Sequence, residues 1–174
     1  MGDLLVKNAN LVNGYRSDIL IQNGIIAEIG RTIHGVDNDT PIIDAGGYLV
    51  TAPFVDSHFH LDATLSYGMP KVNQSGTLLE GIKLWGELKP NLTFDALVER
   101  AITLCRWSIA RGTLAIRTHV DISDPTLLAV EAMLEVKRRM APYIDIQLVA
   151  FPQDGLLRAG SMDNLKRALD LGVD

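Results

Sequence analysis

The spacing of hydrophobic positions changes near residue 54. Before that point the apolar runs are short and are separated by turn residues. These runs are residues 4–6, 18–21, 25–29 and 41–44. Asn13-Gly14 and Asn23-Gly24 lie between runs, and Asn-Gly is the strongest short signal for a hairpin. We therefore predict a small antiparallel sheet over residues 3–51.

After residue 54 the apolar runs alternate with longer segments that have helical periodicity. Strands are predicted at residues 48–60, 114–120 and 144–151, and helices at 77–88, 93–111, 125–140 and 162–171. Strands that alternate with helices are typical of βαβ units, which form a parallel sheet. The second region is therefore predicted to be an α/β structure of three βα units.

Capping residues set the predicted helix boundaries. Thr93 is a candidate N-cap, and Gly112 suits the position just past the C-terminus of the same helix. Asp124 followed by Pro125 predicts the start of the next helix, and Ser161 predicts the start of the last.

Three parallel strands cannot close a barrel, and an open edge leaves backbone groups unpaired. The chain is thus either a small three-layer domain or the front part of a larger one. A (β/α)8 barrel needs about 250 residues, which is more than the 174 of this chain.

Composition narrows the function classes. Hydrophobic residues make up 47% of the chain and the net charge is −5, with no block of lysine or arginine. We therefore expect no nucleic-acid partner and no anionic membrane partner. A single cysteine, Cys105, excludes an internal disulfide and is predicted to be a buried, inert thiol. With no signal peptide and no apolar run long enough to span a bilayer, a cytoplasmic location is expected.

Candidate chemistry begins with His58 and His60. Residues two apart on a strand point to the same side, so the two imidazoles project together. Paired imidazoles suit Zn²⁺ or Fe²⁺, but a catalytic site usually needs at least three protein ligands. Asp56 or Asp62 is expected either to orient a ligand imidazole or to serve as a turn residue. A His-x-His sequence also occurs by chance, and His34, in the first region, is predicted to be an exposed surface residue.

Polar side chains also follow the next two strands. His119 and Asp121 end one strand, and Gln153 and Asp154 follow the other. Active sites in parallel α/β proteins lie at the carboxyl ends of strands. For His119 a functional role and a structural rim role both stay open, and the Gln153 amide suits either a heterocycle edge or a loop cap. Arg117 is expected to form a structural ion pair.

Four segments together resemble the amidohydrolase superfamily, and within it the bacterial cytosine deaminases. They are residues 52–62, 73–82, 117–121 and 144–155. The motifs occur in the family's order, and the resemblance covers the whole chain. Related triazine and isoguanine hydrolases share much of the pattern.

The resemblance implies a (β/α)8 TIM-like barrel preceded by strands of a small β-sandwich domain. Residues 1–51 would be the sandwich part and residues 52–174 the first three βα units of an incomplete barrel. It implies one divalent metal, Fe²⁺ or Zn²⁺, held partly by His58 and His60. The substrate-binding residues are expected to be Gln153, Leu78, Phe151 and His119.

The implied reaction is the hydrolytic deamination of cytosine to uracil and ammonia. The family's remaining metal ligands and its proton shuttle lie on later strands, beyond Asp174, so no catalytic residue is assigned here and the isolated chain is expected to be inactive. The alternatives are another amino-substituted heterocycle, of isoguanine or ammelide type, or a non-catalytic fragment that needs a partner chain. A homo-oligomer or a complementing chain is expected.

Overall fold

The computed structural model describes residues 2–174. The chain divides into two compact units, one ending at Ala52 and the other spanning Pro53–Asp174. Each unit is described by itself below.

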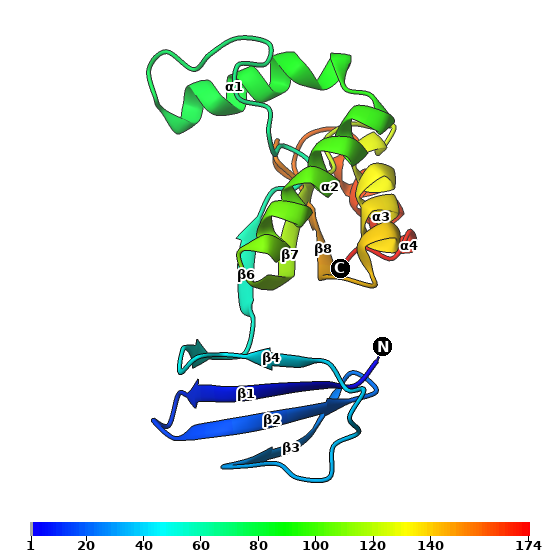
Figure 1. The fold of residues 1–174 in the computed structure, drawn as a ribbon. Coiled ribbons are helices and arrows are strands. Elements are labelled where there is room, and N and C mark those ends of the chain that lie inside the picture. The colour runs from blue at the N-terminus through cyan, green and yellow to red at the C-terminus, as the bar shows by residue number, and fades with distance from the viewer. Residues whose placement is uncertain (1) are drawn as a thin grey trace. The chain divides into compact units, whose positions relative to one another are not determined.

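The first unit is a single sheet. Its strands are β1 (Leu4–Leu11), β2 (Arg16–Gln22), β3 (Ile25–Gly30), β4 (Ile42–Asp44) and β5 (Leu49–Val50). Strands β3, β2, β1 and β4 lie in that order, as Figure 1 shows, and β5 also pairs with β1. Asn23 and Gly24 both have positive φ, 53° and 80°, which is the geometry that a tight two-residue hairpin requires.

The prediction of a wholly antiparallel sheet was wrong. Strands β1, β2 and β3 are antiparallel, but β4 and β5 both run parallel to β1. The reason is the connection after β3, where residues 31–41 return the chain so that β4 runs in the direction of β1. A small core of Leu5, Leu20 and Ile33 supports the sheet, and His34 is exposed, as predicted.

The second unit alternates strands and helices. Its elements are β6 (Phe54–Phe59), α1 (Leu78–Leu88), η1 (Lys89–Asn91), α2 (Phe94–Ala110), β7 (Thr113–Asp121), α3 (Leu128–Met140), β8 (Asp145–Phe151) and α4 (Ser161–Asp170). Strands β6, β7 and β8 form a parallel sheet in that order. All three strands therefore present their carboxyl ends at one edge.

The core of this unit lies between the sheet and its helices. In β7 the side chains of Ile116, Thr118 and Val120 are buried, and α2 and α3 pack against this strand and against each other (Figure 1). Arg117 lies between Ile116 and Thr118 and points to the other face of the strand, where it is exposed. The two faces of β7 therefore differ as strand alternation requires.

Most of the predicted helix ends are confirmed. Thr77 and Thr93 accept hydrogen bonds from the backbone N–H groups of Glu80 and Ala96, and Gly112 has φ +86° just past α2. Trp107, near the end of α2, is 57% exposed.

Two helix starts differ from prediction. Helix α3 begins at Leu128, because Asp124 accepts from the Thr126 backbone N–H within a turn and Leu127 has φ 57°. Ser161 is the first residue of α4, and Gly160 is its N-cap. Helix α3 therefore begins later than the predicted residue 125, and α4 begins one residue before the predicted residue 162.

Among residues 2–174, no helix is both long enough and apolar enough to cross a membrane.

Candidate functional site

Three histidine rings gather at the carboxyl ends of β6 and β7. The ring centroids of His58 and His60 are 5.4 Å apart, and those of His58 and His119 are 4.2 Å apart. His60 and His119 are separated by 5.8 Å. Phe151, the last residue of β8, meets His60 edge to face at 5.2 Å. The ends of β6 and β7 thus contribute a cluster of three imidazoles, and the end of β8 contributes the phenyl ring that packs against it.

Backbone contacts hold the two histidines of the first strand. The Leu61 backbone N–H donates to the Thr118 hydroxyl at 2.8 Å, inside the core. The His58 backbone N–H donates to an Asp56 carboxylate oxygen at 3.2 Å. These bonds tie the end of β6 to β7 and therefore restrict where the imidazoles can lie.

Burial favours the neutral form of two of the rings. Desolvation lowers the pKa of His60, and desolvation together with the nearby His58 lowers the pKa of His119. The neutral imidazole is the form that binds a metal. His119 Nδ1 is buried and has no hydrogen-bond partner among the described residues. The donor set is therefore suited to a divalent transition metal in its chemistry.

The ligand set is incomplete within the described residues. Across residues 2–174, no three His, Cys, Asp or Glu side chains lie in an arrangement that holds a metal ion. His58 and His60 fit the role of two ligands, and the others would have to come from outside this set.

A cavity opens beside the loop that follows β8. Its volume is about 670 Å³, and Gln153, Trp85, Lys89 and Arg158 are among its lining residues. The Gln153 backbone N–H donates to the Phe151 carbonyl at 2.9 Å. This bond holds Gln153 in a tight turn two residues after Phe151. Leu78 is 79% exposed at the first residue of α1 and does not line this cavity.

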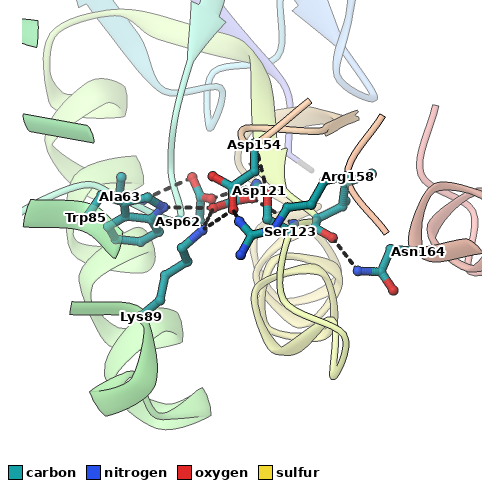
Figure 2. Close-up of polar contacts among 10 residues, drawn as sticks. Asp62, Ala63, Trp85, Lys89, Asp121, Ser123, Asp154, Arg158 and Asn164 are labelled. Carbon is teal, nitrogen blue, oxygen red and sulfur yellow. Dashed lines mark hydrogen bonds and ion pairs between the residues drawn. The ribbon is translucent and has the colours of Figure 1, made fainter. Parts of the chain in front are cut away.

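Asp121 is the centre of a buried polar network (Figure 2). Its side chain is 4% exposed. One carboxylate oxygen accepts from Trp85 Nε1 at 2.9 Å and from Lys89 Nζ at 3.0 Å. The other accepts from the Ser123 backbone N–H at 2.8 Å. Burial alone would raise the pKa of Asp121, but the bonds from Ser123, Lys89 and Trp85 bring it below its ordinary value.

A second buried carboxylate, Asp62, joins this network. It accepts from the Asp121 backbone N–H at 2.9 Å and from the Ala63 backbone N–H at 3.0 Å. Burial raises the pKa of Asp62 to about 6. Asp62 follows His60 by two residues, so the network reaches the metal-ligand candidates through the backbone.

Three sequence expectations can be compared with these contacts. Asp56 and Asp62 bond backbone N–H groups and not imidazole rings, which is the turn-residue alternative. Arg117 forms no ion pair among the described residues, so the expected structural pair was wrong there. The buried Arg expected at this position is instead an exposed side chain on the open face of β7.

The role of Trp85 and Lys89 was missed from the sequence. Neither residue is among the site residues predicted from the sequence. Residues four apart share one side of a helix, so their spacing carried a signal. The partner, Asp121, lies 36 residues from Trp85, and only the fold brings the two together.

Comparison with known proteins identifies the family. The sequence model that describes the amidohydrolase family matches residues 41–171, which is most of the chain. This chain belongs to the amidohydrolase family. Its architecture is accordingly that of the N-terminal part of a TIM-like barrel preceded by strands of a small β-sandwich, as the resemblance implied.

Proteins similar to this chain include two kinds of enzyme, named for N-isopropylammelide and for 5-methylcytosine. The N-isopropylammelide isopropyl amidohydrolase of Pseudomonas sp. (strain ADP) is 35% identical, over 99% of this chain and 44% of its own length. The 5-methylcytosine deaminase of Klebsiella pneumoniae, solved with 5-fluorocytosine, is 38% identical with a TM-score of 0.89. The match covers 98% of this chain and 42% of that structure.

A third similar protein is the N-isopropylammelide isopropylaminohydrolase of Burkholderia multivorans ATCC 17616. It is 31% identical with a TM-score of 0.85, over all of this chain and 44% of that structure. The chain therefore spans less than half the length of these amidohydrolase relatives.

Proposed function

We propose that this amidohydrolase chain forms the front of a metal-dependent active site that hydrolytically deaminates cytosine. The observation that carries the proposal is the cluster of His58, His60 and Phe151 at the carboxyl ends of β6 and β8, with Gln153 two residues beyond Phe151 in the sequence. The similarity to a 5-methylcytosine deaminase supports the same assignment.

In this proposal His58 and His60 hold one divalent metal, Fe²⁺ or Zn²⁺. When bound, such a metal supplies Lewis acidity that makes water a nucleophile near neutral pH. Burial lowers the pKa of His60 and so favours the neutral imidazole, which is the form that a metal binds. The overall proposed reaction adds one water molecule at the ring carbon that bears the amino group and releases ammonia, which converts cytosine to uracil.

The other residues bind and orient the ring. The Gln153 amide can donate one hydrogen bond and accept another, which matches a ring edge that carries a carbonyl beside an N–H. Phe151 and His119, whose ring centroids are 6.1 Å apart at 87°, supply flat surfaces that keep water from the site. Leu78, exposed at the start of α1 and outside this cavity, would join the pocket only in a polypeptide completed with the later strands.

A second candidate is hydrolysis of another amino-substituted heterocycle, of ammelide or isoguanine type. The N-isopropylammelide hydrolases at 35% and 31% identity favour it. Both candidate functions are hydrolytic reactions of the same class. They differ in which heterocyclic substrate the Gln153 amide would bind.

Activity is proposed for a polypeptide that also contains the later barrel strands, because the described residues hold no complete ligand set. The isolated chain is expected to be inactive unless a complementing chain or a second copy supplies the rest. A cytoplasmic location is part of the proposal and agrees with the single free thiol, Cys105, which is buried.

The proposed metal binding by His58 and His60 is tested on the 174-residue chain itself. Cobalt(II) titration, followed by its visible absorption, is compared for wild type, His58→Ala and His34→Ala. His34 is an exposed histidine of the first unit and is the matched control. We expect His58→Ala to weaken binding by at least about tenfold and His34→Ala to have no effect. Equal affinity of all three would refute the ligand assignment.

The substrate half is tested in a polypeptide completed with the later strands. Ammonia release is measured with cytosine, 5-methylcytosine, isoguanine and an ammelide. Gln153→Ala should lower kcat/KM on the preferred ring by about 10²-fold or more, because a buried polar edge is left unpaired. Gln22→Ala, in the first unit, is the control. Turnover of ammelide alone would select the second candidate.

A further inference from the structure

Asp121 connects four segments of the second unit, three through its carboxylate and one through its backbone N–H. It accepts from Trp85 of α1, from Lys89 of η1 and from the Ser123 backbone after β7. Its own backbone N–H donates to Asp62, which follows β6. Every one of these bonds is 3.0 Å or shorter. A buried carboxylate with this many charge-assisted and neutral donors is held in a single position.

The network continues into the loop that carries Gln153. The Asp154 backbone N–H donates to the Ser123 hydroxyl at 3.2 Å, and Lys89 Nζ lies 3.8 Å from the Asp154 carboxylate. Ser123 is itself held by Asp121. Two short paths therefore run from Asp121 to the residue next to Gln153, one through Ser123 and one through Lys89 (Figure 2).

The same contacts build one wall of the cavity. Trp85, Lys89, Ser123, Gln153 and Asp154 all line it, and each except Gln153 is bonded to Asp121 or to its direct partner. Without the carboxylate, α1 and η1 make no polar contact with β7 among the described residues. The shape of the cavity on the Gln153 side thus depends on one buried anion.

We propose that Asp121 is a positioning residue for substrate recognition, which places the Gln153 amide by locking α1, η1 and the loop after β8 onto the strand ends. It does not touch the substrate and acts through Gln153. The inference rests on the proposed function for the identity of the ligand, but the locking itself is a property of this chain.

The locking is tested by the fluorescence of Trp85. The chain has two tryptophans, so every variant is made in a Trp107→Phe background. The tryptophan emission then comes from Trp85. Asp121→Asn keeps an oxygen for the Ser123 N–H but turns an amide NH₂ group toward the Trp85 and Lys89 donors. We expect Trp85 emission to shift to the red and acrylamide quenching to rise about twofold, as local opening becomes easier.

Glu99→Gln is the matched control, because Glu99 is an exposed carboxylate on α2 of the same unit. It should leave Trp85 emission and quenching unchanged, and far-UV circular dichroism should show that both variants keep their helices. If Asp121→Asn loses its helices, Lys89→Met serves as the second variant, since it removes one donor and keeps the carboxylate. Unchanged quenching in a folded Asp121→Asn chain would overturn the inference.

The link to Gln153 is tested by a double-mutant cycle in the completed polypeptide, with cytosine as the probe. Asp121→Asn should raise KM about tenfold and leave kcat within about twofold. In a Gln153→Ala background, Asp121→Asn should add no further rise, because both changes act on one contact. Additive effects on KM would overturn the positioning role. If wild type deaminates no heterocycle, the proposed function fails, and the Trp85 comparison alone then decides whether Asp121 locks these segments.

Discussion

Thr118 offers a sharp test of how the strand ends are held. Its side chain is fully buried. Its hydroxyl accepts a hydrogen bond at 2.8 Å from the backbone N–H of Leu61, the residue that follows His60. Thr118→Val keeps the shape of the side chain but removes the acceptor. The Leu61 N–H is then buried without a partner.

The expected cost can be worked from these contacts. Leaving a buried donor unsatisfied costs about 1–3 kcal/mol, and the added methyl group of valine returns about 0.8 kcal/mol. We therefore expect Thr118→Val to lower the free energy of unfolding of the second unit by about 1–2 kcal/mol. Thr118→Ser keeps the hydroxyl and loses one methyl group, which costs about 1 kcal/mol.

Stability alone separates these two variants poorly, so the assay needs a second observable. Urea unfolding is followed by far-UV circular dichroism, because all the α-helices belong to the second unit. Amide hydrogen exchange of Leu61 is then measured by NMR. The valine variant should lose protection at Leu61, and the serine variant should retain it. Wild-type stability together with wild-type protection in Thr118→Val would refute the assigned role of this bond.

Three further outcomes are expected. Burial raises the pKa of the Cys105 thiol to about 11, so a thiol reagent at about pH 8 should label the chain only after unfolding; rapid labelling of the native chain would contradict this. Gly112→Ala should destabilise the second unit by about 1 kcal/mol or more, because a side chain is strained at φ +86°, while its Cβ would make only an ordinary contact with Phe54 at 3.6 Å; the exposed Gly86→Ala in α1 is the control, expected to be neutral or stabilising. The Asp121 carboxyl has a lowered pKa in the folded chain, so the stability it contributes is present above its ordinary pKa of about 3.9 and is lost as the pH falls below that value. The difference in urea stability between wild type and Asp121→Asn should therefore shrink from about pH 6 to about pH 3, and a constant difference would contradict the assignment.

Local features of the sequence were sufficient to predict most of the elements. Thr93 and Gly112 mark the two ends of α2 because capping and positive φ depend only on neighbouring residues. The start of α3 was misplaced for the same reason, since Asp124 can cap a helix or close a turn with Thr126. The local sequence does not distinguish these two uses of one side chain.

The candidate site divides in a similar way. His58 and His60 could be placed on one side of a strand because alternation along a strand is a local rule. Their grouping with His119 and Phe151 followed from the edge shared by parallel strands. The exposure of Arg117 could not be predicted, because burial depends on what covers that face of β7.

The sequence by itself therefore determined the α/β class, the order of elements, the family motifs and the histidine pair, since each depends on periodicity or on neighbouring residues. Only the tertiary structure decided the parallel pairing of β4 with β1 and the buried network around Asp121. Pairing is set by the path of a loop, and the partners of a buried carboxylate are separated by tens of residues along the chain. A buried charge must find its donors wherever the fold places them, and no spacing in the sequence records that position.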